Sequence, residues 1–144
     1  MSDPLRAVLD TNIILAAQHS RSAQSPNREI LSRFSAGEFT GLYSDDVIDE
    51  YLRKLTEHGI KEITIIELLS AFVALGERVF IEFFHLRHYP VDADDIMFVL
   101  CALNGTASHL VSYDPHLKEA GSFYDEFRTC EPLEFLENLR SALL

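Results

Sequence analysis

Four carboxylate side chains from separate parts of the sequence are candidates for one shared site. Asp10 directly follows the apolar run 7–9, and Asp114 follows a second apolar run near residue 110. Asp95 opens a helical pattern, and Glu50 lies beside the apolar stripe of another helical pattern. In an open α/β sheet, ligands bind in the crevice beyond the carboxyl ends of the strands. We therefore expect these acids to converge at one edge of a sheet.

A converging set of carboxylates indicates a site for a hard divalent cation. Mg²⁺ and Mn²⁺ prefer oxygen ligands and keep positions for water and for a substrate phosphate. The six glycines form neither G-x-G-x-x-G nor G-x-x-x-x-G-K-[ST], which excludes the usual dinucleotide and P-loop sites. A structural role is the alternative for each acid, since Asp10 and Asp95 also suit a helix N-terminus. His85 and His88 have no cysteine or further histidine nearby, so we do not expect a zinc site there.

The elements that must position these acids alternate between strands and helices. Strands are predicted at 7–9, 39–43, 79–84, 110–113 and 129–130, and helices from residue 13 and at 26–37, 44–59, 63–75, 95–105, 115–118 and 132–143. This alternation predicts an α/β protein with three layers, α/β/α, around a central parallel sheet of about five strands. The sequence has 144 residues and shows no linker or internal repeat, so we expect a single domain over residues 1–144.

The helix predicted over residues 63–75 is apolar on more than one side. A helix at the surface of a single domain needs only one apolar face. The second face therefore predicts a homodimer that buries part of this helix. Enclosure of the helix inside a single domain is the alternative.

The composition limits the functional classes and the compartment. The formal net charge is −11, which argues against a protein that binds nucleic acid mainly through phosphate contacts. It does not argue against a nuclease, because a cation can bridge carboxylates and a phosphate. No apolar run is long enough to span a membrane, and no signal peptide is expected. With only two cysteines, a reducing cytoplasm fits best.

Four motifs in order along the chain resemble the PIN-domain ribonucleases. The resemblance is strongest to the bacterial branch of toxin components of toxin–antitoxin systems, the VapC-like proteins. The matching segments are Val8-Leu9-Asp10-Thr11-Asn12, Asp49-Glu50-Tyr51-Leu52, Asp92 through Leu103, and Leu110-Val111-Ser112-Tyr113-Asp114. The segment Pro132-Leu133-Glu134-Phe135-Leu136 is similar to the terminal helix of the family. The resemblance covers about residues 6–139.

The resemblance implies a PIN-like fold and a Mg²⁺- or Mn²⁺-dependent endoribonuclease that hydrolyses RNA phosphodiester bonds. The acidic quartet of the family, which binds metal and carries catalysis, falls on Asp10, Glu50, Asp95 and Asp114. Its accessory positions fall on Asn12, Ser112 and Asp92, and a shift of one residue would exchange Asp94 with Asp95. The family also implies an RNA substrate, an antitoxin protein as a partner and a homodimer. No serine, cysteine or histidine nucleophile is required.

The chain departs from the family pattern at two positions near its last acid. The family often carries another acid two residues after the last one, where this chain has His116, and Tyr113 replaces a position that is often small or basic. A PIN fold that no longer cleaves and serves as a binding or assembly module is the alternative. A metal-dependent phosphatase is a further alternative, which phosphomonoester substrates would reveal. A receiver domain fits poorly, because Asp10 is not one of an acid pair.

Overall fold

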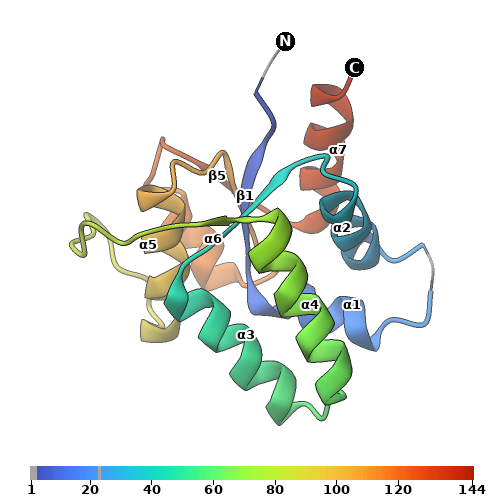
Figure 1. Cartoon of the computed structure of the whole chain (residues 1–144). Coiled ribbons are helices and arrows are strands. Elements are labelled where there is room, and N and C mark those ends of the chain that lie inside the picture. The colour runs from blue at the N-terminus through green and yellow to red at the C-terminus, as the bar shows by residue number, and fades with distance from the viewer. Residues whose placement is uncertain (1–2, 23) are drawn as a thin grey trace.

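Five short parallel strands form the centre of the molecule (Figure 1). The structure is a computed structural model, and it describes residues 3–22 and 24–144. The strands are β1 (Arg6–Leu9), β2 (Thr40–Tyr43), β3 (Glu77–Arg78), β4 (His109–Val111) and β5 (Arg128–Cys130). The helices are α1 (Thr11–His19), α2 (Pro26–Ser35), α3 (Asp45–Glu57), α4 (Glu62–Leu75), α5 (Ile96–Asn104), α6 (Pro115–Gly121) and α7 (Pro132–Ala142), with a 3₁₀ turn η1 (Ala93–Asp95) before α5.

The strand order, β3-β2-β1-β4-β5, places the first strand in the middle of the sheet. Ala7 of β1 is in register with Gly41 of β2 on one side and with His109 of β4 on the other. All four strand pairs are parallel, so all five strands end at the same edge of the sheet. The predicted α/β architecture with about five strands is confirmed.

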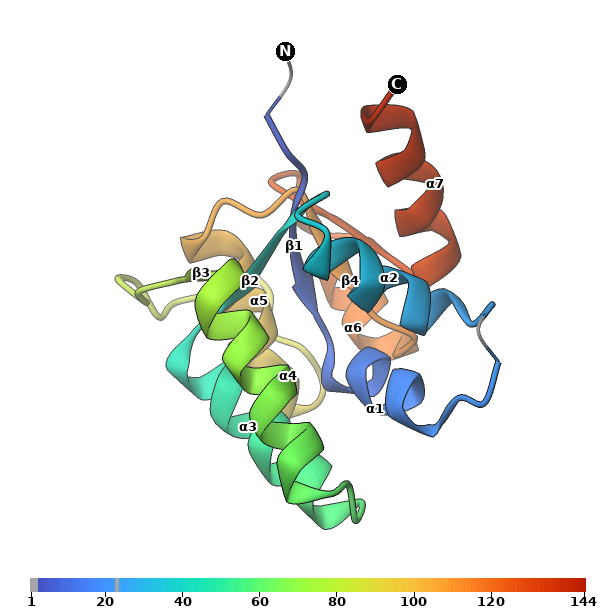
Figure 2. The ribbon, with the colours of Figure 1, turned by 45° about the vertical axis from the view of Figure 1, so that its right-hand side comes forward.

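Helices cover both faces of the sheet (Figures 1 and 2). Helices α2, α4 and α7 lie on one face, and α5 and α6 lie on the other. On the first face the buried rings of Phe34, Phe72 and Phe135 fill the layer between helices and sheet, and the Phe34 and Phe72 rings are stacked 4.8 Å apart. Tyr51 of α3 is fully buried, and its hydroxyl donates a hydrogen bond to the carbonyl of Leu9 at the end of β1.

Local sequence signals explain where several helices begin and end. The hydroxyl of Ser44 caps α3 by accepting a hydrogen bond from the Val47 N–H. Gly37 follows α2 and Gly59 follows α3, with φ angles of +76° and +73°. Glycine adopts this left-handed conformation without steric cost, so it lets the chain leave a helix in a tight turn.

The third strand lies at a different place from the one predicted. The apolar run 79–84 forms a loop, and β3 is the preceding pair of charged residues, Glu77 and Arg78. Arg6 of β1 pairs with Glu77, and Arg78 pairs with Asp45 of α3 at 2.7 Å. These ion pairs suit the exposed edge of the sheet, whereas the loop leaves aromatic side chains such as Phe80 in solvent.

Helix α4 has the apolar second face that its sequence indicates, and this face is exposed. Only Ile65 and Phe72 of the helix are buried. Exposed apolar side chains are Ile63, Ile66, Val73 and Leu75 of α4 and Leu52 of the neighbouring α3. The alternative in which the chain encloses this helix on both sides is therefore wrong. Among the described residues, no helix is both long and apolar enough to cross a membrane.

Candidate active site

Two of the predicted acids lie side by side because their strands are neighbours in the sheet. Asp10 follows β1 and is the N-cap residue of α1, and Asp114 follows β4 and is the N-cap residue of α6. The Asp10 N–H donates a hydrogen bond of 2.9 Å to the carbonyl of Val111, which joins the two strand ends. The Asp114 carboxylate accepts a hydrogen bond of 2.9 Å from the His116 N–H. The pairing of β1 with β4 thus brings together residues that are far apart in the sequence.

Ser112 links these two acids directly. Its side chain is buried, and its hydroxyl donates a hydrogen bond of 2.6 Å to Oδ2 of Asp10. The same hydroxyl oxygen accepts a hydrogen bond of 2.9 Å from the Asp114 N–H. Ser112 therefore fixes the Asp10 carboxylate relative to the backbone of Asp114.

Asp95 completes a group of three acids. It ends the η1 turn, has only 7% of its surface exposed, and keeps one carboxylate oxygen buried with no hydrogen-bond partner among the described residues. Burial raises the pKa of Asp95 to about 7, and the negative charges of Asp114, Asp10 and Asp92 contribute to this rise. Burial also raises the pKa of Asp10, although its hydrogen bond from Ser112 opposes the rise. A buried carboxylate among like charges is stabilised by a proton or by a cation.

Glu50 lies in α3 beside the buried Tyr51, as its sequence position suggests, but it has a different partner. Both of its carboxylate oxygens accept hydrogen bonds of 2.9 Å from one guanidinium nitrogen of Arg53. The side chain is nearly buried, with 9% of its surface exposed. Its charge is therefore balanced within its own helix, unlike the charges of the three aspartates. This pair was not predicted from the sequence, although the spacing of three residues on a helix is a signal for it.

The predicted accessory residues lie around the three aspartates. The carboxylate of Asp92 caps η1 by accepting a hydrogen bond of 2.9 Å from the Asp94 N–H. Asp94 is exposed, whereas Asp95 is buried, so it is Asp95 that interacts with Asp10 and Asp114. Asn12 is exposed in the first turn of α1.

The carboxylates of Asp10, Asp95 and Asp114 are suitable ligands for a divalent cation, but they are not yet arranged around one ion position. Their ligand atoms are carboxylate oxygens, which Mg²⁺ and Mn²⁺ prefer, and the unpaired buried oxygen of Asp95 lacks a cationic partner. In the described part of the chain, however, no three His, Cys, Asp or Glu side chains already surround one ion-sized space. The three aspartates would therefore have to move closer together to surround a cation.

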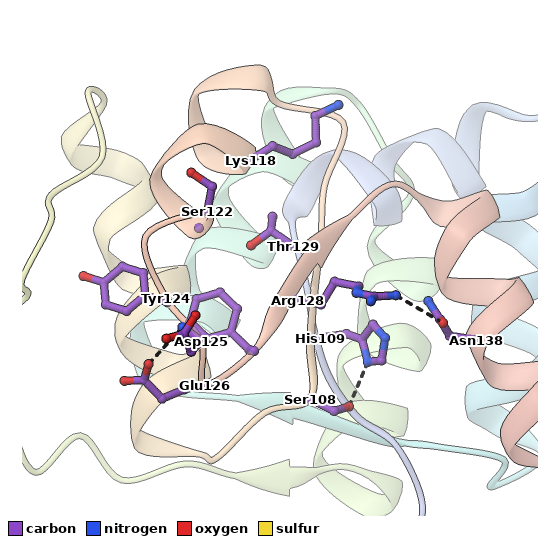
Figure 3. Close-up of a pocket in the computed structure, with 12 residues that line it drawn as sticks. Ser108, His109, Lys118, Ser122, Tyr124, Asp125, Glu126, Arg128, Thr129 and Asn138 are labelled. Atoms are coloured by element: carbon purple, nitrogen blue, oxygen red, sulfur yellow. Dashed lines mark hydrogen bonds between the residues drawn. The ribbon is translucent and has the colours of Figure 1, made fainter.

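A separate pocket of about 720 Å³ opens beside β5, between α6 and α7 (Figure 3). Lys118 lines it on the α6 side and Asn138 on the α7 side, with His109 and Arg128 between them. Burial and the charge of Arg128 lower the pKa of His109, so its imidazole is neutral near pH 7. None of the four predicted acids lines this pocket. This pocket was not predicted from the sequence, although a histidine at the start of an apolar strand was a signal.

Comparison with known proteins agrees with this architecture. The sequence profile of the PIN domain family matches residues 6–116, a range that contains all four acids. Eight chains of solved structures match significantly. One of them, in the crystal structure of VapBC2 from Rickettsia felis bound to a DNA fragment from its promoter, superposes with a TM-score of 0.59. It is 14% identical in sequence, and the match covers 88% of this chain and 98% of that chain, so the similarity shows a shared fold. No curated protein matches significantly.

Proposed function

Because the chain belongs to the PIN domain family, we propose that it is a Mg²⁺- or Mn²⁺-dependent endoribonuclease that hydrolyses RNA phosphodiester bonds. The observation that carries this proposal is the group formed by Asp10, Asp95 and Asp114, in which a buried Asp95 oxygen has no hydrogen-bond partner in the described part of the chain. Mutual repulsion raises the free energy of this group unless positive charge is added. A divalent cation supplies that charge, and it can activate water for attack on a phosphate.

The side chains of this group have different roles in the proposed reaction. Asp10, Asp95 and Asp114 would hold the cation, with Glu50 as a fourth ligand after it leaves Arg53. A bound Mg²⁺ or Mn²⁺ would activate a water molecule and neutralise the charge that develops on the phosphate. Ser112 keeps Asp10 in place through its hydrogen bond of 2.6 Å. Released from Glu50, the Nη2 group of Arg53 could contact the RNA backbone while its Nη1 group stays paired with Glu57 at 2.9 Å.

The test of this function is cleavage of a mixed RNA pool by the purified chain with Mg²⁺, with Mn²⁺ and with EDTA. We expect cleavage that depends on the divalent cation and that Asp10→Asn abolishes, because this variant removes one ligand charge with almost no change in volume. Duplex DNA and a phosphomonoester tested in parallel show whether the substrate is RNA. Equal cleavage by the parent and by Asp10→Asn would assign the activity to a contaminant.

A non-catalytic binding or assembly module is the second candidate, and the geometry gives it one specific argument. Glu50 is fully engaged by Arg53, and no three acidic, histidine or cysteine side chains of the described residues surround one ion site. The replacement Arg53→Ala distinguishes the two functions. This variant leaves Glu50 without its partner Arg53. If the chain is a nuclease, the variant should still cleave RNA only with a divalent cation. If the chain is a binding module, the variant should cleave no RNA with any cation.

We also propose that the chain acts in the cytoplasm as the toxin of a toxin–antitoxin pair. The fold that it shares with a chain of the VapBC2 complex supports this role. Two buried, free cysteines, Cys101 and Cys130, suit a reducing compartment. The partner would be an antitoxin protein, in addition to the RNA substrate.

The exposed face of α4 leads to a prediction about assembly. We expect a homodimer at micromolar concentration, because Ile66 is 52% exposed beside other exposed apolar side chains and such surfaces are usually covered. Ile66→Glu should shift the dimer to monomer by placing a charge in the interface. Sedimentation measures both states. Leu133→Glu, at an exposed leucine on α7, is the matched control and should leave the dimer intact. A parent protein that sediments as a monomer contradicts the prediction.

A further inference from the structure

A small hollow of about 90 Å³, here called the notch, lies next to the acids. It is lined on one side by His88, Tyr89 and Val91 and on the other by His116, Glu119 and Phe123. Val91 directly precedes Asp92, and the His116 N–H donates its hydrogen bond to the Asp114 carboxylate. The notch therefore adjoins Asp114 through His116, and the chain on its other side leads into Asp92.

Aromatic rings dominate the lining of the notch and remain open to solvent. The rings of His88 and Phe123 are stacked, with centroids 3.9 Å apart and an angle of 19° between their planes. Phe123 and Tyr89 are each 54% exposed. Burial of large rings is usually favourable, so rings that stay exposed beside a catalytic edge indicate a surface that a ligand covers.

The wall that carries His88 is held in a fixed position. The Tyr124 hydroxyl donates a hydrogen bond of 2.8 Å to the His88 carbonyl and accepts one of 3.1 Å from the His88 N–H. Arg87 lies over the Tyr124 ring at 5.0 Å and pairs with Glu126 at 2.7 Å. Leu86 anchors the same loop because it is buried in the core. A ligand that enters the notch therefore meets a preorganised surface and loses little free energy in ordering it.

We propose that the notch binds one unpaired base of the RNA strand whose phosphate lies at the acids. This inference rests on the proposed nuclease function and adds to it a subsite for one base, built by the stacked rings of His88 and Phe123. Flat rings stack on every base, whereas a base inside a duplex is already stacked and paired and cannot enter. His116 and Glu119 provide polar groups for the edge of the base. The site explains how an acidic protein holds RNA, because stacking does not depend on positive charge.

The experiment measures binding of a short, labelled, single-stranded RNA by fluorescence anisotropy with Mg²⁺, in the full chain carrying Asp95→Asn so that the RNA is not cut. Adding Phe123→Leu should weaken binding by about 5- to 150-fold, the effect of removing one aromatic stacking partner. Phe123→Tyr should retain the affinity, because it keeps the ring. Phe84→Leu is the matched control, since it removes an exposed phenylalanine that lies outside the notch, in the loop that carries His88. The RNA in duplex form should bind weakly to all of these variants.

The outcomes separate this proposal from the nuclease function. If the parent cuts RNA but Phe123→Leu binds it as tightly as Phe123→Tyr, the base site is wrong and the nuclease function stands. Equal losses with Phe84→Leu and Phe123→Leu also overturn it, because the effect is then not local. If Phe123→Leu leaves RNA binding intact but lowers the sedimented mass of the protein, the notch is a protein contact. If the parent neither binds nor cuts RNA, both proposals fail.

Discussion

Replacing Asp95 with Asn is expected to slow RNA hydrolysis by about 100- to 10,000-fold. Stabilisation of charge by a metal ion contributes several kcal/mol to such reactions, and each 1.4 kcal/mol is about tenfold in rate. Asp95 is the acid with the strongest need for a cation, because it is buried near Asp10 and Asp114 and has an unpaired oxygen. Asn keeps the volume of the side chain but removes the charge. Initial rates on a fluorogenic RNA measure the effect.

Three further variants show whether the loss is specific to the acid group. Asp114→Asn should lose as much activity as Asp95→Asn, since both acids belong to the same group. Asp94→Asn and Asp125→Asn should keep nearly the parent rate, because Asp94 is exposed and Asp125 lines the separate pocket beside β5. An active Asp95→Asn variant, or an inactive Asp94→Asn variant, contradicts the assignment of Asp95.

The metal-free protein is expected to lose stability as the pH rises from about 4 to about 7. The pKa of Asp95 is about 7 in the folded state, compared with 3.8 for the free group. Between these values the folded chain keeps a proton that the unfolded chain has lost, so the free energy of unfolding falls with rising pH. If solvent did not screen the Asp95 charge, the free energy of unfolding would fall by about 4 kcal/mol. Screening by solvent near the acids reduces this fall to about 2 kcal/mol. Urea denaturation in EDTA measures it.

Two controls identify the source of this pH dependence. Asp95→Asn should remove most of it and should make the metal-free protein more stable at pH 7, whereas Asp94→Asn should not. Acids in ion pairs, such as Glu29 and Glu77, have a lowered pKa, so their contribution to stability is lost only at lower pH. Mn²⁺ should raise the melting temperature of the parent above pH 7, because it binds the native state. Stability that rises between pH 4 and pH 7 in EDTA would contradict the expectation.

The sequence predicted the centre of the fold and the neighbouring positions of Asp10 and Asp114. Both residues follow short apolar runs, and in the structure each of these runs forms a buried strand. It also favoured Asp95 over Asp94, a choice that agrees with the burial of Asp95. The interaction of Glu50 with Arg53 was harder to predict from the sequence, because an acid at the border of a helix face has several possible partners.

The loop between β3 and η1 shows why other features were missed. Apolar periodicity identifies side chains that prefer burial, but it does not show whether the fold has room for them. The run 79–84 was therefore assigned to a strand, although Phe80 and Phe84 are exposed. The notch was missed for a related reason. His88 and Phe123 lie far apart in the sequence and meet only because the loop packs against the connection after α6.

The position of β1 between β2 and β4 also determines when the acids can meet during synthesis. Asp10 and Ser112 are separated by 102 residues, and their contact forms only after β4 has paired with β1. While a ribosome is still making α5, β1 and β2 can already pair, but Asp10 has no Asp114 beside it. Contacts between distant residues also form slowly. The group of three aspartates therefore stays incomplete in the nascent chain until β4 has been made and has paired with β1.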